Sequence, residues 1–237
     1  IRRGGNYDVL PNLRMEGERR RLMGASLLKK ADNGKDLLDL FKGSERERKK
    51  TELLAWVEEA SKHNQAGLEA LSHLPTLESA GGELVRTLYN QAKNLVLRAQ
   101  IYPGQKQYLD EAIEAIKALK EWGQAINNPD IIARADLVES DLIRFGISGQ
   151  PGKSELVPAL RANLRALDAT EKPKKDVAIE VAINGGEILL ELGETEAAKR
   201  CIGRAMQLYT TPPHNQLILD AREDRLRKLC QQVGFPF

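Results

Sequence analysis

The sequence predicts an all-α protein in which antiparallel helix pairs stack side by side and a last helix caps the end of the stack. Composition is the first observation, because aromatic residues make up only 5% of the 237 residues and straight-chain residues, which lose little rotamer freedom in a helix, are abundant. Periodicity is the second, since apolar residues return every three or four positions rather than alternating as in strands. The third is punctuation by Gly and Pro between these apolar patterns.

Charge is distributed unevenly along the chain. Residues 1–50 contain 14 Lys and Arg against 8 Asp and Glu, a net of 14 − 8 = +6, whereas the whole chain carries +2 and the remainder therefore 2 − 6 = −4. A basic segment of this kind can contact phosphates or acidic surfaces. We expect two regions, a basic and partly extended arm at 1–43 and a helical-repeat domain at 44–237.

The arm contains few residues that could build a core. Residues 1–12 are expected to be extended, and residues 13–31 to form a basic helix that Gly17 and Gly24 weaken by about 1 kcal/mol each. We expect the arm to fold on a partner or to pack loosely against the rest of the chain.

The first strong helix signal is a capping box, in which Ser44 and Glu47 satisfy each other's backbone N–H groups. The helix that follows is expected to reach about residue 60, and a second one at 66–74 to end at Pro75, which cannot donate a backbone hydrogen bond. The other expected helices cover residues 83–100, 106–122, 130–145, 156–167, 177–192, 195–209 and 214–233. The last of these would cover the apolar end of the stack.

One segment, residues 179–212, carries the spacing of a known repeat. The residues that carry it are Gly186, Gly193, Ala198, Ile202, Ala205 and Pro212. Small residues let two helices cross closely, and the large one fills the gap between repeats. In these features the segment resembles the tetratricopeptide repeat, and weaker matches extend the resemblance over about residues 83–212. Because the helix pairs start about 46 residues apart, and not about 34, the repeats are degenerate.

The resemblance implies a right-handed tetratricopeptide-like α-solenoid whose first helices line a concave groove for a peptide or a helix of another protein. The groove would grade from basic to acidic along the stack. Its residues, carried over from the motif positions and their neighbours, would be Arg86, Tyr89, Asn90, Lys93, Asp136, Ser140, Glu180, Ile183 and Glu187. Asn90 and Lys93 fit part of a clamp for a C-terminal carboxylate, but the later repeats offer acidic residues where the clamp needs cations.

No motif in the sequence predicts catalysis, a cofactor or a metal ion. Residues 149–154 end in Gly-Lys-Ser as a phosphate-binding loop does, but that pattern needs Gly where Ile147 stands, and it needs a preceding strand. The histidines His63, His73 and His214 lack zinc-binding spacing. We therefore expect a protein that is not an enzyme and that has no cofactor.

Cysteine usage bears on the compartment. Cys201 and Cys230 fall on apolar helix faces and are expected to be free thiols, which suits the cytoplasm or another reducing compartment. No apolar run approaches the roughly 18 residues of a membrane span. Since the chain begins at Ile1 and not Met, we expect a fragment or a processed product, and import of a precursor into an organelle stays open.

These features favour a non-catalytic scaffold or adaptor that binds another protein. The alternative is a nucleic-acid-associated subunit of a larger assembly, in which Arg19, Arg20 and Arg21 contact phosphates or an acidic partner. An enzyme would need ionisable groups that converge in a pocket, which spacing alone does not reveal. Self-association also stays open, because an open stack has apolar ends. The sequence identifies neither the partner nor the oligomeric state.

Overall fold

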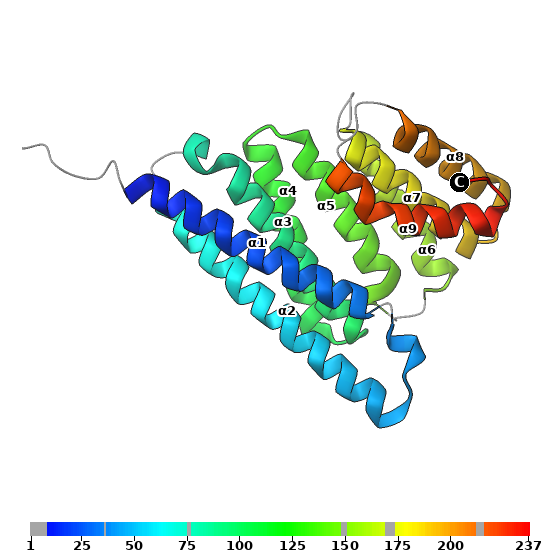
Figure 1. Ribbon diagram of the computed structural model, residues 1–237, viewed down its shortest axis with the longest axis horizontal. Helices are drawn as coiled ribbons and strands as arrows, with labels where there is room; N and C mark the ends of the chain where they lie inside the picture. The colour runs from blue at the N-terminus through cyan, green and yellow to red at the C-terminus, as the bar shows by residue number, and fades with distance from the viewer. Residues whose placement is uncertain (1–8, 36, 75–76, 148–150, 169–173, 212–215) are drawn as a thin grey trace, which may run out of the picture. The chain divides into compact units, whose positions relative to one another are not determined.

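The computed structural model describes residues 9–35, 37–74, 77–147, 151–168, 174–211 and 216–237, and this part of the chain contains helices and no strand (Figure 1). The predicted all-α class is therefore confirmed. The elements are α1 (Val9–Lys35), η1 (Leu38–Leu40), α2 (Gly43–Ser72), α3 (Leu77–Ile101), α4 (Lys106–Ala125), α5 (Pro129–Asp141), η2 (Leu142–Gly146), α6 (Lys153–Asp168), α7 (Lys175–Glu191), α8 (Thr195–Thr210) and α9 (Gln216–Val233).

The chain forms two compact units, within which helices pack mainly against their neighbours in sequence, as in an α-solenoid. Unit 1 comprises Ile1–Leu119 with Gly146–Gly149, and unit 2 comprises Lys120–Phe145 with Gln150–Phe237. The division between the compact units falls within α4, and the boundary that the sequence predicts after residue 43 stays a prediction.

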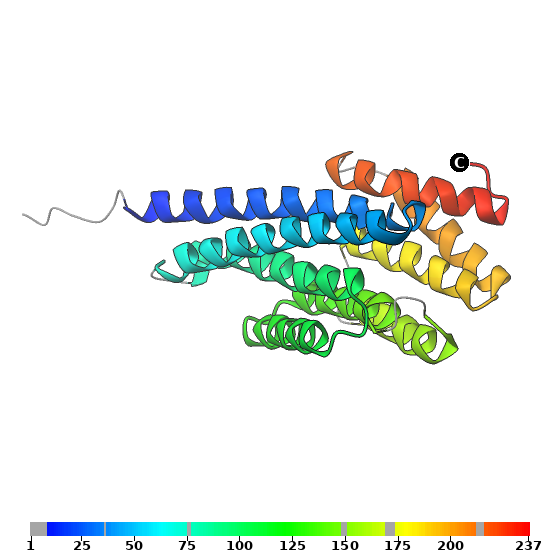
Figure 2. The same cartoon turned by 90° about the horizontal axis from the view of Figure 1, so that it is seen from below.

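Helix α1 belongs to the core of unit 1 and is not an extended arm from Val9 onward. It begins four residues before the helix that the sequence predicts from residue 13, and it packs along α2 and α3 (Figure 2). Its Leu28 and Ala31 are buried in one apolar cluster with Leu53 and Val57 of α2. The remaining part of the expected arm, residues 1–8, lies outside the described residues.

Two glycines let α1 approach α2 closely. A β-carbon on Gly17 would lie 2.7 Å from the side chain of Leu71, and one on Gly24 would lie 2.4 Å from Oδ1 of Asn64 and 3.1 Å from the carbonyl oxygen of Ala60. Glycine costs a helix about 1 kcal/mol relative to alanine, which argued against this helix. The close packing that the missing side chains permit offsets that cost.

Helix α2 is continuous over 30 residues, whereas the sequence predicts two shorter helices with a break after about residue 60. Ala60, Asn64, Gly67 and Leu71 are all buried, and they follow one another at intervals of four, three and four residues. This spacing places them on one helix face, so packing against α1 extends through the segment where the apolar pattern in the sequence fades.

Unit 2 contains the pairs α5–α6 and α7–α8, and α9 packs on both α7 and α8. Three residues of the repeat-like segment, Ala198, Ile202 and Ala205, are fully buried on α8. A β-carbon on Gly186 of α7 would come within 2.9 Å of Ile202. The close crossing that these small residues predict is therefore present in this pair of helices.

The end of α7 also follows the prediction of a turn at Gly193. This glycine has a φ of +82°, a left-handed conformation that only glycine adopts without steric cost. The N–H of Gly193 donates to the carbonyl of Leu190 at 3.0 Å, and the N–H of Glu194 donates to that of Leu189 at 2.8 Å. These two bonds satisfy carbonyls at the end of the helix and turn the chain into α8.

The segment η2 is a π-helix, whereas the sequence predicts a regular helix as far as residue 145. A π turn closes its hydrogen bonds over five residues instead of four and is commonly a single turn within a longer helix. Its Arg144 is buried and bonds to carboxylates of α7, at 2.7 Å from Glu187 and also to Glu191.

Candidate functional site

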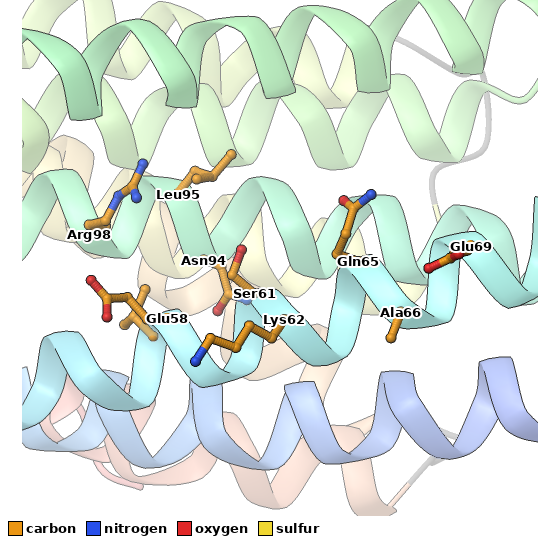
Figure 3. Close-up of a pocket in the computed structure, with 10 residues that line it drawn as sticks. Glu58, Ser61, Lys62, Gln65, Ala66, Glu69, Asn94, Leu95 and Arg98 are labelled. Atoms are coloured by element: carbon orange, nitrogen blue, oxygen red, sulfur yellow. The ribbon is translucent and has the colours of Figure 1, made fainter.

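Unit 1 contains a cleft of about 550 Å³ between α2 and α3 (Figure 3). This volume is in the usual range for ligand sites, and most of the lining residues are polar or charged. They are Val57, Glu58, Ser61, Lys62, Gln65, Ala66 and Glu69 of α2, with Asn94, Leu95 and Arg98 of α3.

The cleft follows the long axis of α2. Its residues on that helix recur every three or four positions from Glu58 to Glu69, so they share one face of the helix. Eleven residues at a rise of about 1.5 Å each give this face a length of about 16 Å. The cleft is thus an elongated depression with an apolar contribution from Val57, Ala66 and Leu95.

Asn94 is the most unusual residue of the cleft. It is fully buried, and neither its Oδ1 nor its Nδ2 has a hydrogen-bond partner. Ser61 lies beside it (Figure 3), but the Ser61 hydroxyl is engaged with Gln91, whose Nε2 donates to it at 2.9 Å. An unsatisfied buried polar group costs about 1–3 kcal/mol, and a carboxamide offers both donors and an acceptor. A ligand that bonded Asn94 would recover that cost.

The cations of the cleft form ion pairs within the described part of the chain, whereas its carboxylates do not. Lys62 pairs with Glu59 at 3.3 Å, and Arg98 pairs with Glu111 and lies 4.4 Å from the centre of the Tyr108 ring. Burial lowers the pKa of the Arg98 guanidinium, and nearby Tyr108 and Glu58 partly oppose that effect. By contrast, no cation among the described residues lies within 4 Å of the carboxylates of Glu58 and Glu69.

The groove residues that the sequence predicts on α3 lie on another face of that helix. None of Arg86, Tyr89 and Lys93 is among the residues that line the cleft. Nζ of Lys93 lies 5.8 Å from the centre of the Tyr89 ring, and Arg86 pairs with Glu83 at 2.9 Å. These residues adjoin each other along α3.

Asn90, the fourth predicted groove residue of α3, lies one helical turn before Asn94 and on nearly the same face of the helix. Its Nδ2 is buried without a hydrogen-bond partner. Asn90 as a whole is half-buried, and its part in a carboxylate clamp with Lys93 stays a prediction.

Three predicted groove residues of unit 2 are buried and do not line an open surface. Ile183 is fully buried in the apolar cluster of α7, α8 and α9. The Ser140 hydroxyl donates to the carbonyl of Ala159 at 2.8 Å. Asp136 is buried between Lys120, at 2.7 Å, and Arg165, at 3.3 Å. The sequence-based register assumed an uncovered concave face, which these contacts exclude for this stretch.

The two remaining predicted residues, Glu180 and Glu187, face arginines of α9 from within the same unit. Arg225 lies 3.1 Å from Glu180 and 2.9 Å from Glu187, and Arg222 also pairs with Glu180. Burial alone would raise the pKa of Glu187, but Arg225 and Arg144 outweigh it and hold that pKa below its ordinary value. Helix α9 therefore supplies the cations for this acidic stripe.

The basic triplet of α1 is engaged in ion pairs inside unit 1. Arg21 pairs with Glu83 of α3 at 2.5 Å, and both side chains are largely buried. Arg20 pairs with Glu16 at 2.6 Å. Arg19 also contacts Glu16, at 3.3 Å, and is the most exposed of the three. A phosphate ligand would have to compete with these carboxylates.

The cleft is not predicted from the sequence, because the apolar periodicity of α3 indicates a helix with one buried face. The apolar stripe of α3, which includes Leu88 and Leu95, lies on a different face of the helix from Asn94, about 100° or more away. The polar face that carries Thr87 and Asn94 reads as solvated, yet both residues are fully buried because α1 and α2 cover this side. The sequence signal for the cleft is the set of polar residues on a second face of α3. These residues are expected to be buried only if α1 packs against the other helices of unit 1.

No protein-family model matches the sequence, and no curated protein or solved structure matches the chain. Among the described residues, no helix combines the length and the apolar character that crossing a membrane requires. The same part of the chain contains no group of three His, Cys, Asp or Glu side chains able to hold a metal ion.

Proposed function

We propose that this chain is a non-catalytic adaptor that binds a segment of another protein in the cleft between α2 and α3. The observation that carries the proposal is Asn94, a fully buried carboxamide without a partner that lines a cleft of ligand size. Natural proteins keep few such groups, and each calls for an explanation. A peptide group supplies the complementary donor and acceptor.

The shape and the chemistry of the cleft favour a chain segment over a small reacting substrate. A length of about 16 Å along α2 suits an elongated ligand. The cleft is lined by neither histidine nor cysteine, and its one hydroxyl, on Ser61, is bonded to Gln91 and not to a base. A nucleophile needs an adjacent base to become reactive, so these residues support binding without catalysis.

The proposal keeps the predicted class of function and moves its site. The sequence predicts a groove on the first helix of each repeat, whereas the cleft uses α2, for which no repeat motif is found, and a different face of α3. The tetratricopeptide-like relationship and its groove remain a separate hypothesis, which rests on residues 179–212.

The test is a selection of binding peptides from a random 12-residue library displayed on phage, with the full chain as target. Selected peptides are then measured against Asn94→Ala and against Asn64→Ala. The two asparagines are a matched pair, since both are fully buried and neither amide has a partner, but only Asn94 lines the cleft. Hydrogen exchange on both variants confirms that the helices of unit 1 stay folded.

We expect Asn94→Ala to weaken binding by about tenfold, the effect of one buried hydrogen bond, and Asn64→Ala to leave it unchanged. The proposal fails if the library yields no binder, or if every binder is indifferent to Asn94→Ala. Binding of single-stranded RNA that is lost on Arg19→Gln would instead support the nucleic-acid alternative.

A further inference from the structure

We infer that the ligand of the cleft is an extended segment that carries two lysine or arginine side chains four residues apart. This inference rests on the proposed function and names the chemistry of the partner. Three observations carry it: the two carboxylates at the ends of the cleft, the distance between them, and the unpartnered amide of Asn94.

The carboxylates of the cleft lack a direct cation, while its cations have carboxylates of their own. Lys62 is held by Glu59 on the same helix, and Arg98 by Glu111. Glu58 and Arg98 interact electrostatically at a distance, but no direct ion pair joins them among the described residues. Glu58 and Glu69 thus leave two negative charges that a basic ligand complements.

The spacing of these carboxylates sets the spacing of the basic side chains. Glu58 and Glu69 are eleven residues apart on α2, or about 16 Å along the helix. In an extended chain, side chains four residues apart lie on the same face and about 13 Å from each other. The long, flexible side chains of lysine or arginine span the remaining few ångströms.

The amide of Asn94 selects an extended ligand over a helical one. Oδ1 and Nδ2 can pair with the N–H and the carbonyl of one peptide group of the ligand. The backbone groups of a helix are already bonded to each other, whereas those of an extended segment are available. Asn94 lines the cleft but is fully buried, so binding requires that side chains of the cleft move aside to admit the ligand.

The experiment measures the fluorescence anisotropy of labelled nine-residue peptides of alanine and threonine with blocked ends. The first peptide has lysines at positions 3 and 7, the second has the same composition with lysines at 4 and 5, and the third has glutamates at 3 and 7. Each is titrated with the full chain and with the variants Glu58→Gln, Glu69→Gln and Glu47→Gln. Glu47 lies on α2 outside the cleft and is exposed, so its variant is the matched control for charge.

We expect the spaced lysine peptide to bind most tightly and to lose about threefold to fivefold in affinity with each cleft variant, the usual effect of one exposed ion pair. Glu47→Gln should have no effect. Equal binding of the spaced and adjacent lysine peptides, or insensitivity to both cleft variants, overturns the inference.

The outcome is separable from that of the proposed function. Library peptides that require Asn94 but lack spaced basic residues would leave the adaptor function standing and reject this ligand class. A library without cleft-dependent binders would reject both.

Discussion

The two units differ in how they treat polar groups in their interiors. In unit 2, Arg144 is only 5% exposed and is bonded to Glu187 and Glu191, so a buried charge has direct partners. In unit 1, Asn64 and Asn94 are fully buried and their amides have none. The buried charge of unit 2 thus has its partners, and the buried amide of Asn163 there donates to the carbonyl of Val181, although its Oδ1 accepts no bond from the described residues. In unit 1 both amides leave all of their hydrogen-bonding capacity unused within the described part of the chain.

This difference separates structural polar groups from groups available to a ligand. Removing one partner of a buried ion pair leaves an uncompensated charge and is strongly destabilising. Removing an amide that makes no hydrogen bond takes away a desolvation cost at the same time as it takes away packing. We therefore expect substitution of a buried, paired charge in unit 2 to lower the free energy of unfolding strongly. Substitution of an equally buried amide without a partner in unit 1 should lower it little.

The largest effect is expected from Arg144→Ala in unit 2. This change leaves Glu191 and one side of Glu187 without their buried cation, and we expect it to lower the free energy of unfolding by about 3–5 kcal/mol. Denaturant unfolding combined with hydrogen exchange of α5 and α7 measures the loss and assigns it to unit 2. Lys199→Ala removes an exposed pair with Glu196 on α8 and serves as the control, for which no measurable change is expected.

A smaller loss is expected from Gly24→Ala in unit 1. The added β-carbon would lie 2.4 Å from Oδ1 of Asn64 and 3.1 Å from the carbonyl of Ala60, and overpacking of this kind costs about 1–3 kcal/mol. Gly82→Ala on α3 is the matched control, because no atom lies within 4 Å of its β-carbon, and alanine there should stabilise the helix by up to about 1 kcal/mol. Thermal unfolding compares the two. Equal destabilisation by both would mean that α1 does not approach α2 this closely.

Acid should weaken unit 2 through Glu187. Its pKa is lowered in the folded protein from an ordinary value of 4.5, so its contribution to stability is complete above about pH 4.5 and is lost as the pH falls through the folded pKa. One proton changes the free energy of unfolding by at most about 1.4 kcal/mol per pH unit. Unfolding between pH 7 and pH 3 should show a shallower loss for Glu187→Gln than for the wild type, and identical slopes would contradict this account.

The smallest effect is expected from Asn64→Ala in unit 1. Because the Asn64 amide makes no hydrogen bond, the lost packing and the removed desolvation cost oppose each other. We expect the free energy of unfolding to change by less than about 1 kcal/mol. A loss as large as that of Arg144→Ala would show that the amide is bonded and that the contrast between the units is false.

The sequence predicted the parts of the fold that depend on local pattern. The helix pair α7–α8 could be derived from Gly186, Gly193 and Ile202, since small residues at a crossing and a glycine at a helix end act through nearest neighbours. The order of the helices from α3 onward follows from apolar periodicity and from breakers in the same way.

The parts that failed depend on contacts between residues far apart in the sequence. Helix α1 has few apolar residues and two glycines within its close contact with α2, a feature that in isolation argues against a helix. The cleft could not be predicted for the same reason, because Asn94 is buried only once α1 and α2 cover the polar face of α3. The predicted groove failed at Ile183 and Ser140, where the assumed exposure depended on what other helices cover.

The π turn η2 has a consequence for changes in chain length. A π turn holds one residue more than the α turn that would otherwise occupy its place, so Leu142–Gly146 can be regarded as an inserted residue that the helix has absorbed. Deleting one residue there would restore regular winding and rotate the side chains that follow the deletion within this helical segment by about 100°. A deletion before Arg144 would turn its guanidinium away from the carboxylates of α7 that now hold it.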